Sequence, residues 1–346
     1  MAGGVRLPGV SERQMMNDQL ESLIQRALGH AYGLCGVDVA RVHAGTATAN
    51  FVISDSSGPR WFAKIYRNRS DLPRECGAIA LAGFARAGGL PVPRLHRAID
   101  GAVIGRSDDL ALSLWDFVPA ETAEGGLSGP RWVAVGTVVG HLHRRLASYP
   151  AVRRVHRPAS GLCDLQVARA RYDALIADYR RQRPGDAFQA WALEAAVERR
   201  SLLPRVQAIL EALPALSTQV VHGDLATPNL LLRGNEVAAI VDFQPPARRY
   251  LSWEVARIGC DPRTIDLDDT WTTKLPELLG AYRDANPDAL DADVTSVIAV
   301  GCAYTLASTY PLAEPLKNAD RISESLEEYG RSRHRAALAM LAHLDS

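Results

Sequence analysis

The stretch VVHGDLATPNLLL, residues 220–232, places a histidine, a glycine, an aspartate and then an asparagine between apolar runs. Glycine, aspartate and asparagine in a short cluster usually form a turn, so the simplest interpretation is a surface loop between two strands. The following residues, RGNEVAAIVDF at 233–243, indicate more than a loop. They predict a hairpin turn at RGNE, a second strand at VAAIV, and an aspartate, Asp242, where that strand ends.

Three side chains that carry oxygen atoms are predicted to converge at the open end of this hairpin. Asp224 follows the strand that ends at Val221, and Asn229 directly precedes the strand LLL. Antiparallel strands joined by a tight turn put their other ends side by side, so Asn229 and Asp242 are expected to be neighbours, with Asp224 close by. Such oxygen donors suit Mg²⁺, which leaves coordination positions for water and phosphate. Phosphoryl transfer needs a metal, a base for the hydroxyl proton, and positioning, so this pattern indicates that reaction.

The chain is predicted to have two lobes of different character, in an α+β fold. Residues 1–116 form a strand-rich lobe, with the first 30 or so residues unassigned. Residues 117–346 form a helical lobe that carries one small sheet, and the cleft between two such lobes is the expected ligand site. Expected strands are 49–54, 60–66, 103–106 and 110–118, and expected helices are 72–89, 131–149, 165–182, 186–213, 271–285, 291–310 and 317–343.

The combination of HGDLATPNLLL with IVDF resembles the aminoglycoside phosphotransferase and choline-kinase-like family, small-molecule kinases that are distant relatives of protein kinases. The resemblance implies a protein-kinase-like fold with a small antiparallel-sheet N-lobe, which binds the nucleotide, and a mostly helical C-lobe. It implies Asp224 as the catalytic base, Asn229 and Asp242 as Mg²⁺ ligands, and His222 as a support for the loop. ATP is the expected phosphoryl donor, with GTP as an alternative.

A kinase-like first lobe should supply a lysine to the phosphates and a glutamate that holds this lysine. Lys64 is the only lysine in the first half of the chain and lies within the apolar strand WFAKIY. Burying a lone lysine without a partner is costly, and Glu75, at the start of the next helix, is the expected partner. The alternatives are an edge-strand lysine with a solvated head, and a glutamate placed in the first helical turn by the helix dipole.

Two further segments resemble nucleotide-binding parts of the family. HAGTATANFVIS at 43–54 occupies the place of the loop that covers the phosphates, where Gly45 allows close backbone approach and Thr46 can donate a hydroxyl. An ordinary hairpin loop is the alternative. LWDFVPA at 114–120 resembles the hinge between the lobes, which implies that the backbone from Asp116 to Val118 bonds the base; it also fits a plain buried strand. His143 is expected to be structural.

Composition gives no support for several other classes of protein. The counts of Lys plus Arg and of Asp plus Glu are both 39, so there is no basic excess of the kind that nucleic-acid-binding proteins usually show. The five cysteines are scattered without a CxxC pair, which suits reduced thiols in the cytoplasm. No secretion signal and no apolar run long enough to span a bilayer is found. The expected partner is a hydroxylated small molecule, with no nucleic acid and no membrane.

The identity of the acceptor stays open because the charges after Asp242 point in two directions. An acidic group at Asp266, Asp268 and Asp269 could attract a cationic amino sugar or could simply begin a helix, whereas Arg248 and Arg249 would suit an anion. Three functions therefore compete. The first is a kinase for an aminoglycoside or other hydroxylated antibiotic, in resistance or self-protection. The second is a metabolic kinase for an amino sugar, sugar, choline-like alcohol or hydroxy amino acid. The third is a nucleotide-binding pseudokinase.

Overall fold

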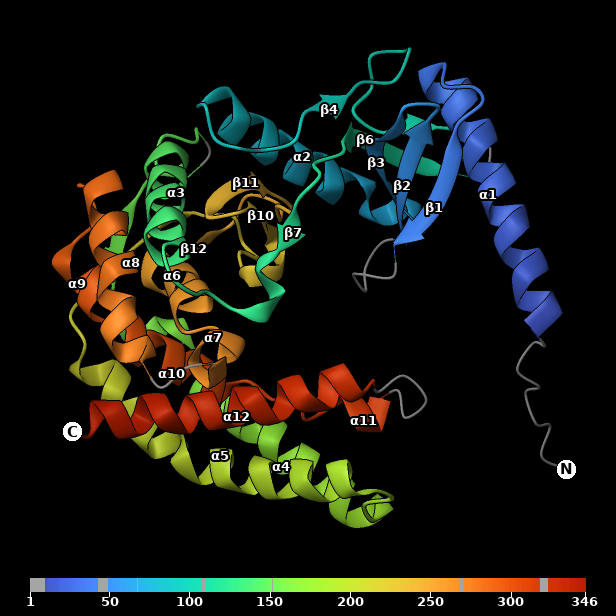
Figure 1. Cartoon of the computed structure of the whole chain (residues 1–346). Helices are drawn as coiled ribbons and strands as arrows, with labels where there is room; N and C mark the ends of the chain where they lie inside the picture. The colour runs from blue at the N-terminus through green and yellow to red at the C-terminus, as the bar shows by residue number, and fades with distance from the viewer. Residues whose placement is uncertain are drawn as a thin grey trace, which may run out of the picture. The chain divides into compact units, whose positions relative to one another are not determined.

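The computed structural model describes residues 10–42, 49–66, 68–107, 110–150, 152–267, 270–317 and 323–346. Contacts divide the chain into two compact units (Figure 1). Unit 1 comprises Met1–Arg86 and Val92–Pro119, and unit 2 comprises Ala87–Pro91 and Ala120–Ser346.

Unit 1 is built on an antiparallel sheet. Its order is β1-β2-β3-β6-β4, with β5 also paired to β6. The strands are β1 (Asp38–Val42), β2 (Ala49–Asp55), β3 (Gly58–Tyr66), β4 (Leu95–His96), β5 (Gly105–Arg106) and β6 (Ala111–Asp116). The predicted hairpin is present, since β2 and β3 pair from Ala49↔Ile65 to Asp55↔Gly58. The register places Lys64 of β3 between Asn50 of β2 and Ser113 of β6, in the middle of the sheet.

In the described part of unit 1, two α-helices pack against the sheet, and only the second is predicted from the sequence. Helix α2 (Leu72–Ala87) follows the short 3₁₀ helix η1 (Arg69–Asp71) and ends where Gly89 adopts a φ of 84°. Helix α1 (Val10–Tyr32) lies in the N-terminal segment that the sequence left unassigned. Ile24 and Leu28 of α1 are fully buried in one core with the apolar side chains of β2. A hydrogen bond of 2.9 Å from the Tyr32 hydroxyl to the Leu112 carbonyl oxygen ties the end of α1 to the sheet.

Unit 2 is mostly helical. Its longer helices are α3 (Arg131–Leu146), α4 (Leu165–Gln182), α5 (Ala187–Ala212), α6 (Leu251–Gly259), α8 (Trp271–Ala285), α10 (Val297–Ala307) and α12 (Glu324–Leu344). Shorter ones are α7 (Pro262–Leu267), α9 (Asp291–Thr295), α11 (Glu314–Lys317) and the 3₁₀ turns η2 (Ala123–Gly125), η3 (Ala159–Leu162) and η4 (Thr227–Asn229). The prediction of one helix over 291–310 is wrong, because Ser296, with ψ near 0°, interrupts it between α9 and α10.

Helices α3 and α8 run side by side in close contact (Figure 1). Glycine lowers helix propensity, yet α3 contains Gly136 and Gly140 at this contact. A Cβ at Gly136 would lie 2.2 Å from the carbonyl oxygen of Leu278, and one at Gly140 would lie 2.6 Å from that of Tyr282. The two glycines therefore allow the backbones to approach, and this contact holds the C-terminal half of α3 next to Tyr282.

Two small antiparallel sheets position the segment around Asp224. One has the order β11-β10-β7 and the other β12-β9-β8. The strands are β7 (Glu121–Thr122), β8 (Val155–Arg157), β9 (Leu216–Val220), β10 (Leu230–Arg233), β11 (Glu236–Ile240) and β12 (Arg248–Tyr250). The predicted RGNE hairpin is confirmed by the pairing of Arg233 with Glu236 and by the φ of 61° at Gly234. Residues 221–229 thus connect one small sheet to the other.

In the part of the chain that the structure describes, no helix combines the length and the apolar character needed to cross a membrane.

Candidate active site

The loop that joins β9 to β10 is held at its start by the His222 side chain. The ring is fully buried, and its Nδ1 accepts the backbone N–H of Asp224 at 3.2 Å. The neutral ring then carries its proton on Nε2, which donates to the carbonyl oxygen of Val241 at 2.9 Å. The N–H of Gln244 closes the same link by donating to the carbonyl of His222 at 2.9 Å. His222 therefore fastens the loop to the segment that follows β11.

Glu254 of α6 is the anchor beneath this loop. Its side chain is 0% exposed, and its two oxygens accept the backbone N–H groups of His222 at 2.9 Å and Gly223 at 2.7 Å. The Nε2 of His143 donates to the same carboxylate at 3.0 Å. Burial alone would raise the pKa of the Glu254 carboxyl, but the hydrogen bond and charge of His143 lower it below its usual range. Glu254 is thus an ionised, fully partnered carboxylate.

The histidine behind Glu254 is part of a longer chain of hydrogen bonds. His143 Nδ1 lies 2.9 Å from the Tyr282 hydroxyl, which lies 3.1 Å from the side-chain nitrogen of Asn286. The amide nitrogen donates to the tyrosine hydroxyl, which shares a further hydrogen bond with His143 Nδ1. His143 is buried in this network and has the structural position expected from the sequence.

Asp224 is held by an arginine that sequence reasoning missed. Arg257 Nη2 donates to Asp224 Oδ1 at 2.5 Å, and Arg257 Nε donates to the Leu225 carbonyl oxygen at 3.0 Å. The Asp224 side chain is still 46% exposed. Partial burial raises its pKa, and the charge of Arg257 acts in the opposite direction. The available signal was the spacing of Glu254 and Arg257, one helical turn apart, which places both on the face of α6 towards the loop.

The structure brings Asn229 and Asp242 together at the open end of the β10–β11 hairpin. The backbone N–H of Val241 donates to the Asn229 carbonyl at 3.1 Å, next to the paired residues Leu230 and Ile240. The Asn229 side chain reaches the other way, because its Nδ2 donates to the Asp224 carbonyl oxygen at 2.8 Å. Asp242 itself has a φ of 65°, a conformation that is uncommon outside glycine and recurs where a site constrains the backbone.

This pair of residues fits a Mg²⁺ ion. Because Asn229 Nδ2 is used as a donor, the amide oxygen is the atom that can face a cation, and Asp242 contributes a carboxylate. Within the described ranges no group of three or more His, Cys, Asp or Glu side chains could hold a metal. Mg²⁺ does not require one, since it is usually bound by one or two protein oxygens together with phosphate oxygens and water.

The residues predicted to bind nucleotide lie in unit 1. Lys64 is in β3, and Glu75 is in the first turn of α2. Burial lowers the pKa of Lys64 to about 8, and the opposite charge of Glu75 limits this decrease. The solvated edge-strand alternative for Lys64 is wrong, because β3 is flanked by β2 and β6. Gly45 and Thr46 lie outside the described residues.

In the predicted hinge segment, residues 114–120, fewer backbone groups are available to bond a base than the sequence suggested. The Asp116 N–H donates to the Arg94 carbonyl at 2.8 Å, and the Phe117 N–H donates to the Arg60 carbonyl at 2.9 Å. The Asp116 carboxylate lies 2.7 Å from His96 Nε2. These two N–H groups and the carboxylate are therefore not available to a base, so the predicted contact would use other backbone groups of this segment, such as the Asp116 carbonyl and the Val118 N–H.

Two of the charged residues considered for the acceptor, Asp266 and Arg248, have partners elsewhere. Asp266 accepts Arg335 Nε at 3.0 Å, while Asp268 and Asp269 lie outside the described residues. Arg248 Nη1 donates to the Arg153 carbonyl oxygen at 2.7 Å. Polar side chains near the Asp224 loop come instead from α6, α10 and α12, and their separation in sequence gave no local signal.

A sheet-based unit with a partly buried lysine in its central strand, joined to a helical unit with an Asp–Asn–Asp set around a hairpin, defines the class of protein-kinase-like small-molecule kinases. The sequence model of the phosphotransferase enzyme family matches residues 38–291. The chain belongs to this family, it is a kinase that acts on hydroxyl groups of small molecules, and the resemblance stated above is confirmed. No curated protein sequence matches the chain significantly.

Solved structures show the same fold at low sequence identity. A spectinomycin phosphotransferase in complex with ADP and spectinomycin is 13% identical, with a TM-score of 0.66 over 93% of this chain and 98% of that one. An amicoumacin kinase in complex with AMP-PNP and Ca²⁺ is 15% identical, with a TM-score of 0.61 over 94% and 95%. A microcompartment-associated aminopropanol kinase is 15% identical, with a TM-score of 0.57 over 94% and 97%. The predicted protein-kinase-like α+β fold is confirmed.

Proposed function

We propose that the chain transfers the γ-phosphoryl group of ATP to the hydroxyl of a small molecule at the site formed by Asp224, Asn229 and Asp242. The proposal rests on one observation. The Val241–Asn229 backbone bond sets Asn229 beside Asp242, while the Asn229 side chain holds the Asp224 backbone. These links support a role for Asp224 as the base and for the Asn229 and Asp242 oxygens as metal ligands, all in one small segment of unit 2.

In the proposed mechanism Asp224 accepts the proton of the acceptor hydroxyl. The hydroxyl oxygen forms a bond to the γ-phosphorus, and the bond from this phosphorus to the oxygen bridging it to the β-phosphate breaks, which releases ADP. Asn229 and Asp242 would hold Mg²⁺, which supplies charge neutralisation on the phosphates when it is bound. Arg257 keeps the Asp224 carboxylate in place, and Glu254 keeps the loop in place, so orientation is set before substrate binds.

On the nucleotide side, Lys64 is proposed to bind the α- and β-phosphates, with Glu75 orienting it. The Asp116 carbonyl and the Val118 N–H are proposed to contact the base. Two of the similar structures were determined with ADP or AMP-PNP bound, and one of them with Ca²⁺, which supports ATP as donor and a divalent metal as cofactor. The cytoplasm, where ATP is present, also suits five cysteines that are all free thiols.

The acceptor is proposed to be a hydroxylated small molecule, with antibiotics and metabolic alcohols as the two candidate classes. The spectinomycin and amicoumacin enzymes support the first class, and the aminopropanol kinase supports the second. A regulatory pseudokinase is not supported, because the chain belongs to an enzyme family and retains every residue of the proposed chemistry.

A transfer assay tests this proposal. The protein is incubated with Mg²⁺ and ATP or GTP against pooled aminoglycosides, other hydroxylated antibiotics, amino sugars, sugars, amino alcohols and hydroxy acids. Mass spectrometry should detect one member gaining a single phosphoryl group, and an Asp224→Asn blank should not produce it. Binding of Mg·ATP without any phosphorylated product, across all of these classes, would contradict the proposed transfer.

Nucleotide affinity is expected to decrease as the pH rises through the pKa of Lys64, about 8. Only the protonated lysine binds phosphates strongly, and above this pH the free protein must take up a proton when nucleotide binds. The dissociation constant of Mg·ADP should therefore be about tenfold higher at pH 9 than at pH 7. Isothermal titration across this range measures it.

The matched control is Lys64→Arg, whose guanidinium remains charged throughout this range. Its affinity for Mg·ADP should change little between the two pH values. If the wild-type dissociation constant is equally independent of pH, Lys64 does not bind the phosphates.

A further inference from the structure

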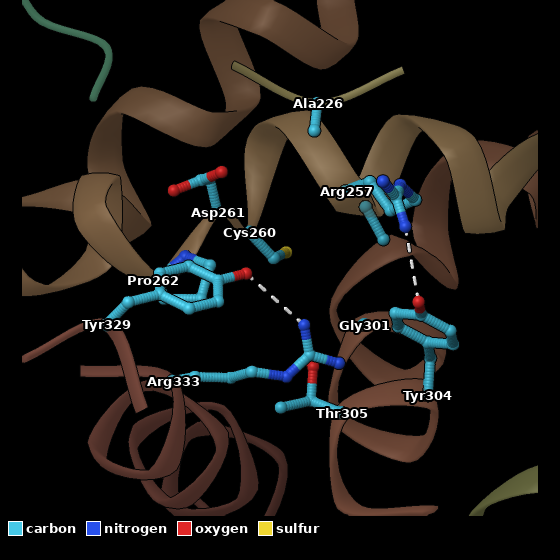
Figure 2. Close-up of a pocket in the computed structure, with 11 residues that line it drawn as sticks. Ala226, Arg257, Cys260, Asp261, Pro262, Gly301, Tyr304, Thr305, Tyr329 and Arg333 are labelled. Atoms are coloured by element: carbon cyan, nitrogen blue, oxygen red, sulfur yellow. Dashed lines mark hydrogen bonds between the residues drawn. The ribbon is translucent and has the colours of Figure 1, made fainter. Parts of the chain in front are cut away.

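A cavity of about 50 Å³ lies in unit 2 next to the Asp224 loop. This volume is sufficient for a carboxylate-sized group or a few water molecules. Its walls come from the loop and from α6, α7, α10 and α12 (Figure 2). Its polar lining includes Arg257, Asp261, Tyr304, Tyr329 and Arg333.

Arg333 of α12 is the unusual member of this lining. Its side chain reaches between Tyr329 and Tyr304 towards the middle of the cavity (Figure 2), yet the residue is only 7% exposed. Nη1 donates to the Tyr329 hydroxyl at 3.3 Å, whereas the buried Nε and Nη2 have no hydrogen-bond partner. No carboxylate within the described ranges forms an ion pair with it. Buried donors without partners are costly, and an anion in the cavity would satisfy them.

Arg257 contributes a second guanidinium and links the cavity to Asp224. Its Nη2 is bonded to the Asp224 carboxylate, and its Nη1 donates to the Tyr304 hydroxyl at 3.2 Å. The same guanidinium lies 5.2 Å from the centre of the Trp253 ring, which limits its movement. A group bound against Arg257 in the cavity would therefore be separated from the carboxylate of the proposed base only by the Arg257 guanidinium.

The single acidic side chain of the lining does not cancel these charges. Asp261 is buried, its Oδ2 accepts the Thr227 hydroxyl at 2.9 Å, and its Oδ1 accepts the Arg263 backbone N–H at 2.9 Å. Arg263 Nη1 also lies 3.8 Å from this carboxylate. Asp261 is thus occupied in holding η4 against the start of α7, and the cavity keeps an excess of positive charge.

We infer that this cavity binds a carboxylate of the acceptor between Arg257 and Arg333 while the acceptor's hydroxyl lies at Asp224. The acceptor is then a hydroxy acid, of which a hydroxy amino acid is one kind. This inference rests on the proposed function and narrows its substrate class. A polycationic aminoglycoside is disfavoured at this position, because its ammonium groups would face two guanidinium groups.

The test compares each hydroxy acid of the pool with its own carboxamide, which keeps the hydroxyl and removes the charge. The wild-type protein should use the acid with a kcat/KM about 10- to 100-fold higher, the size expected of one or two charge-assisted hydrogen bonds. Arg333→Met should lower kcat/KM for the acid by a similar factor and leave the amide almost unchanged. Arg333→Lys should retain part of the preference.

The control is Arg335→Met, on the same helix but exposed and paired with Asp266, which should preserve the acid preference. An Arg333→Met protein that folds and keeps the full preference would overturn the inference, leaving Arg333 a structural residue stacked between Tyr304 and Tyr310. The inference would also be overturned if the wild type used acids and amides equally or preferred cationic acceptors. Either result would leave the proposed kinase function intact. Absence of any transfer would instead contradict the proposed function.

A second measurement on the wild type does not depend on a variant folding. Simple carboxylates without a hydroxyl, such as propionate and isobutyrate, should inhibit competitively against the acceptor and not against ATP. The matching primary amides should not inhibit. Failure of these carboxylates to compete would contradict the assignment of the cavity.

Discussion

Replacing Asp224 by asparagine is expected to reduce kcat by about 10²- to 10⁴-fold, the usual contribution of a positioned general base. Asparagine has nearly the same shape and can still accept a hydrogen bond from Arg257, but it cannot take the hydroxyl proton. The dissociation constant of Mg·ADP should change little, because Asp224 touches the acceptor in the proposed mechanism. Steady-state kinetics and isothermal titration measure the two effects separately.

The matched control is Asp266→Asn, an aspartate that also pairs with an arginine, Arg335, but lies on α7. It should retain wild-type kcat. If Asp224→Asn keeps kcat within a few-fold of wild type, then Asp224 is not the base. If it loses ADP binding as strongly as turnover, its role is in the nucleotide site instead.

Replacing Glu254 by alanine is expected to destabilise the protein by about 3–5 kcal/mol, the usual cost of removing one partner of a buried charged pair. The change leaves the N–H groups of His222 and Gly223 and the ring of His143 without their acceptor. Thermal unfolding should shift downward by roughly 6–20 °C for a unit of this size. Activity below the transition should also fall, because the loop that carries Asp224 loses its anchor.

One further variant separates the charge of Glu254 from its shape, and a second serves as a surface control. Glu254→Gln keeps the size of the side chain and one accepting oxygen, so its loss of stability should be smaller than that of alanine. Glu277→Ala, which removes an exposed carboxylate of α8 paired with Lys274, should melt close to the wild type. Unchanged melting and unchanged kcat in Glu254→Ala would show that the buried network does not support the loop.

The β10–β11 hairpin is the part that the sequence predicted best, and the reason is local. A glycine-containing turn fixes which strand residues pair, and the pairing alone puts Asn229 beside Asp242. Helices such as α4 and α5 were also predictable from local composition. Helix α1 was not assigned, although Leu20, Ile24 and Leu28 repeat every four residues, which is the spacing of one helical face.

The cavity residues were not predictable, because their positions depend on contacts between distant segments. Arg257 meets Asp224 across 33 residues of sequence, and the cavity brings Arg333 of α12 against Tyr304 of α10. Local sequence gives no sign of these contacts, because Arg257, Tyr304 and Arg333 lie on three different helices, α6, α10 and α12. The acidic residues near Asp266 left both a cationic acceptor and a helix start open, because the sequence does not reveal that Arg335 pairs with Asp266.

The most direct test of the proposed site is anomalous diffraction from crystals of the protein grown with ADP and Mn²⁺, which substitutes for Mg²⁺. We expect an anomalous peak within bonding distance of both the Asn229 side-chain oxygen and the Asp242 carboxylate. An Asp242→Asn crystal grown in the same way should lose or weaken the peak. Bound ADP with its Mn²⁺ peak away from both residues would contradict the assignment of Asn229 and Asp242, and with it the phosphoryl-transfer centre placed at the end of this hairpin.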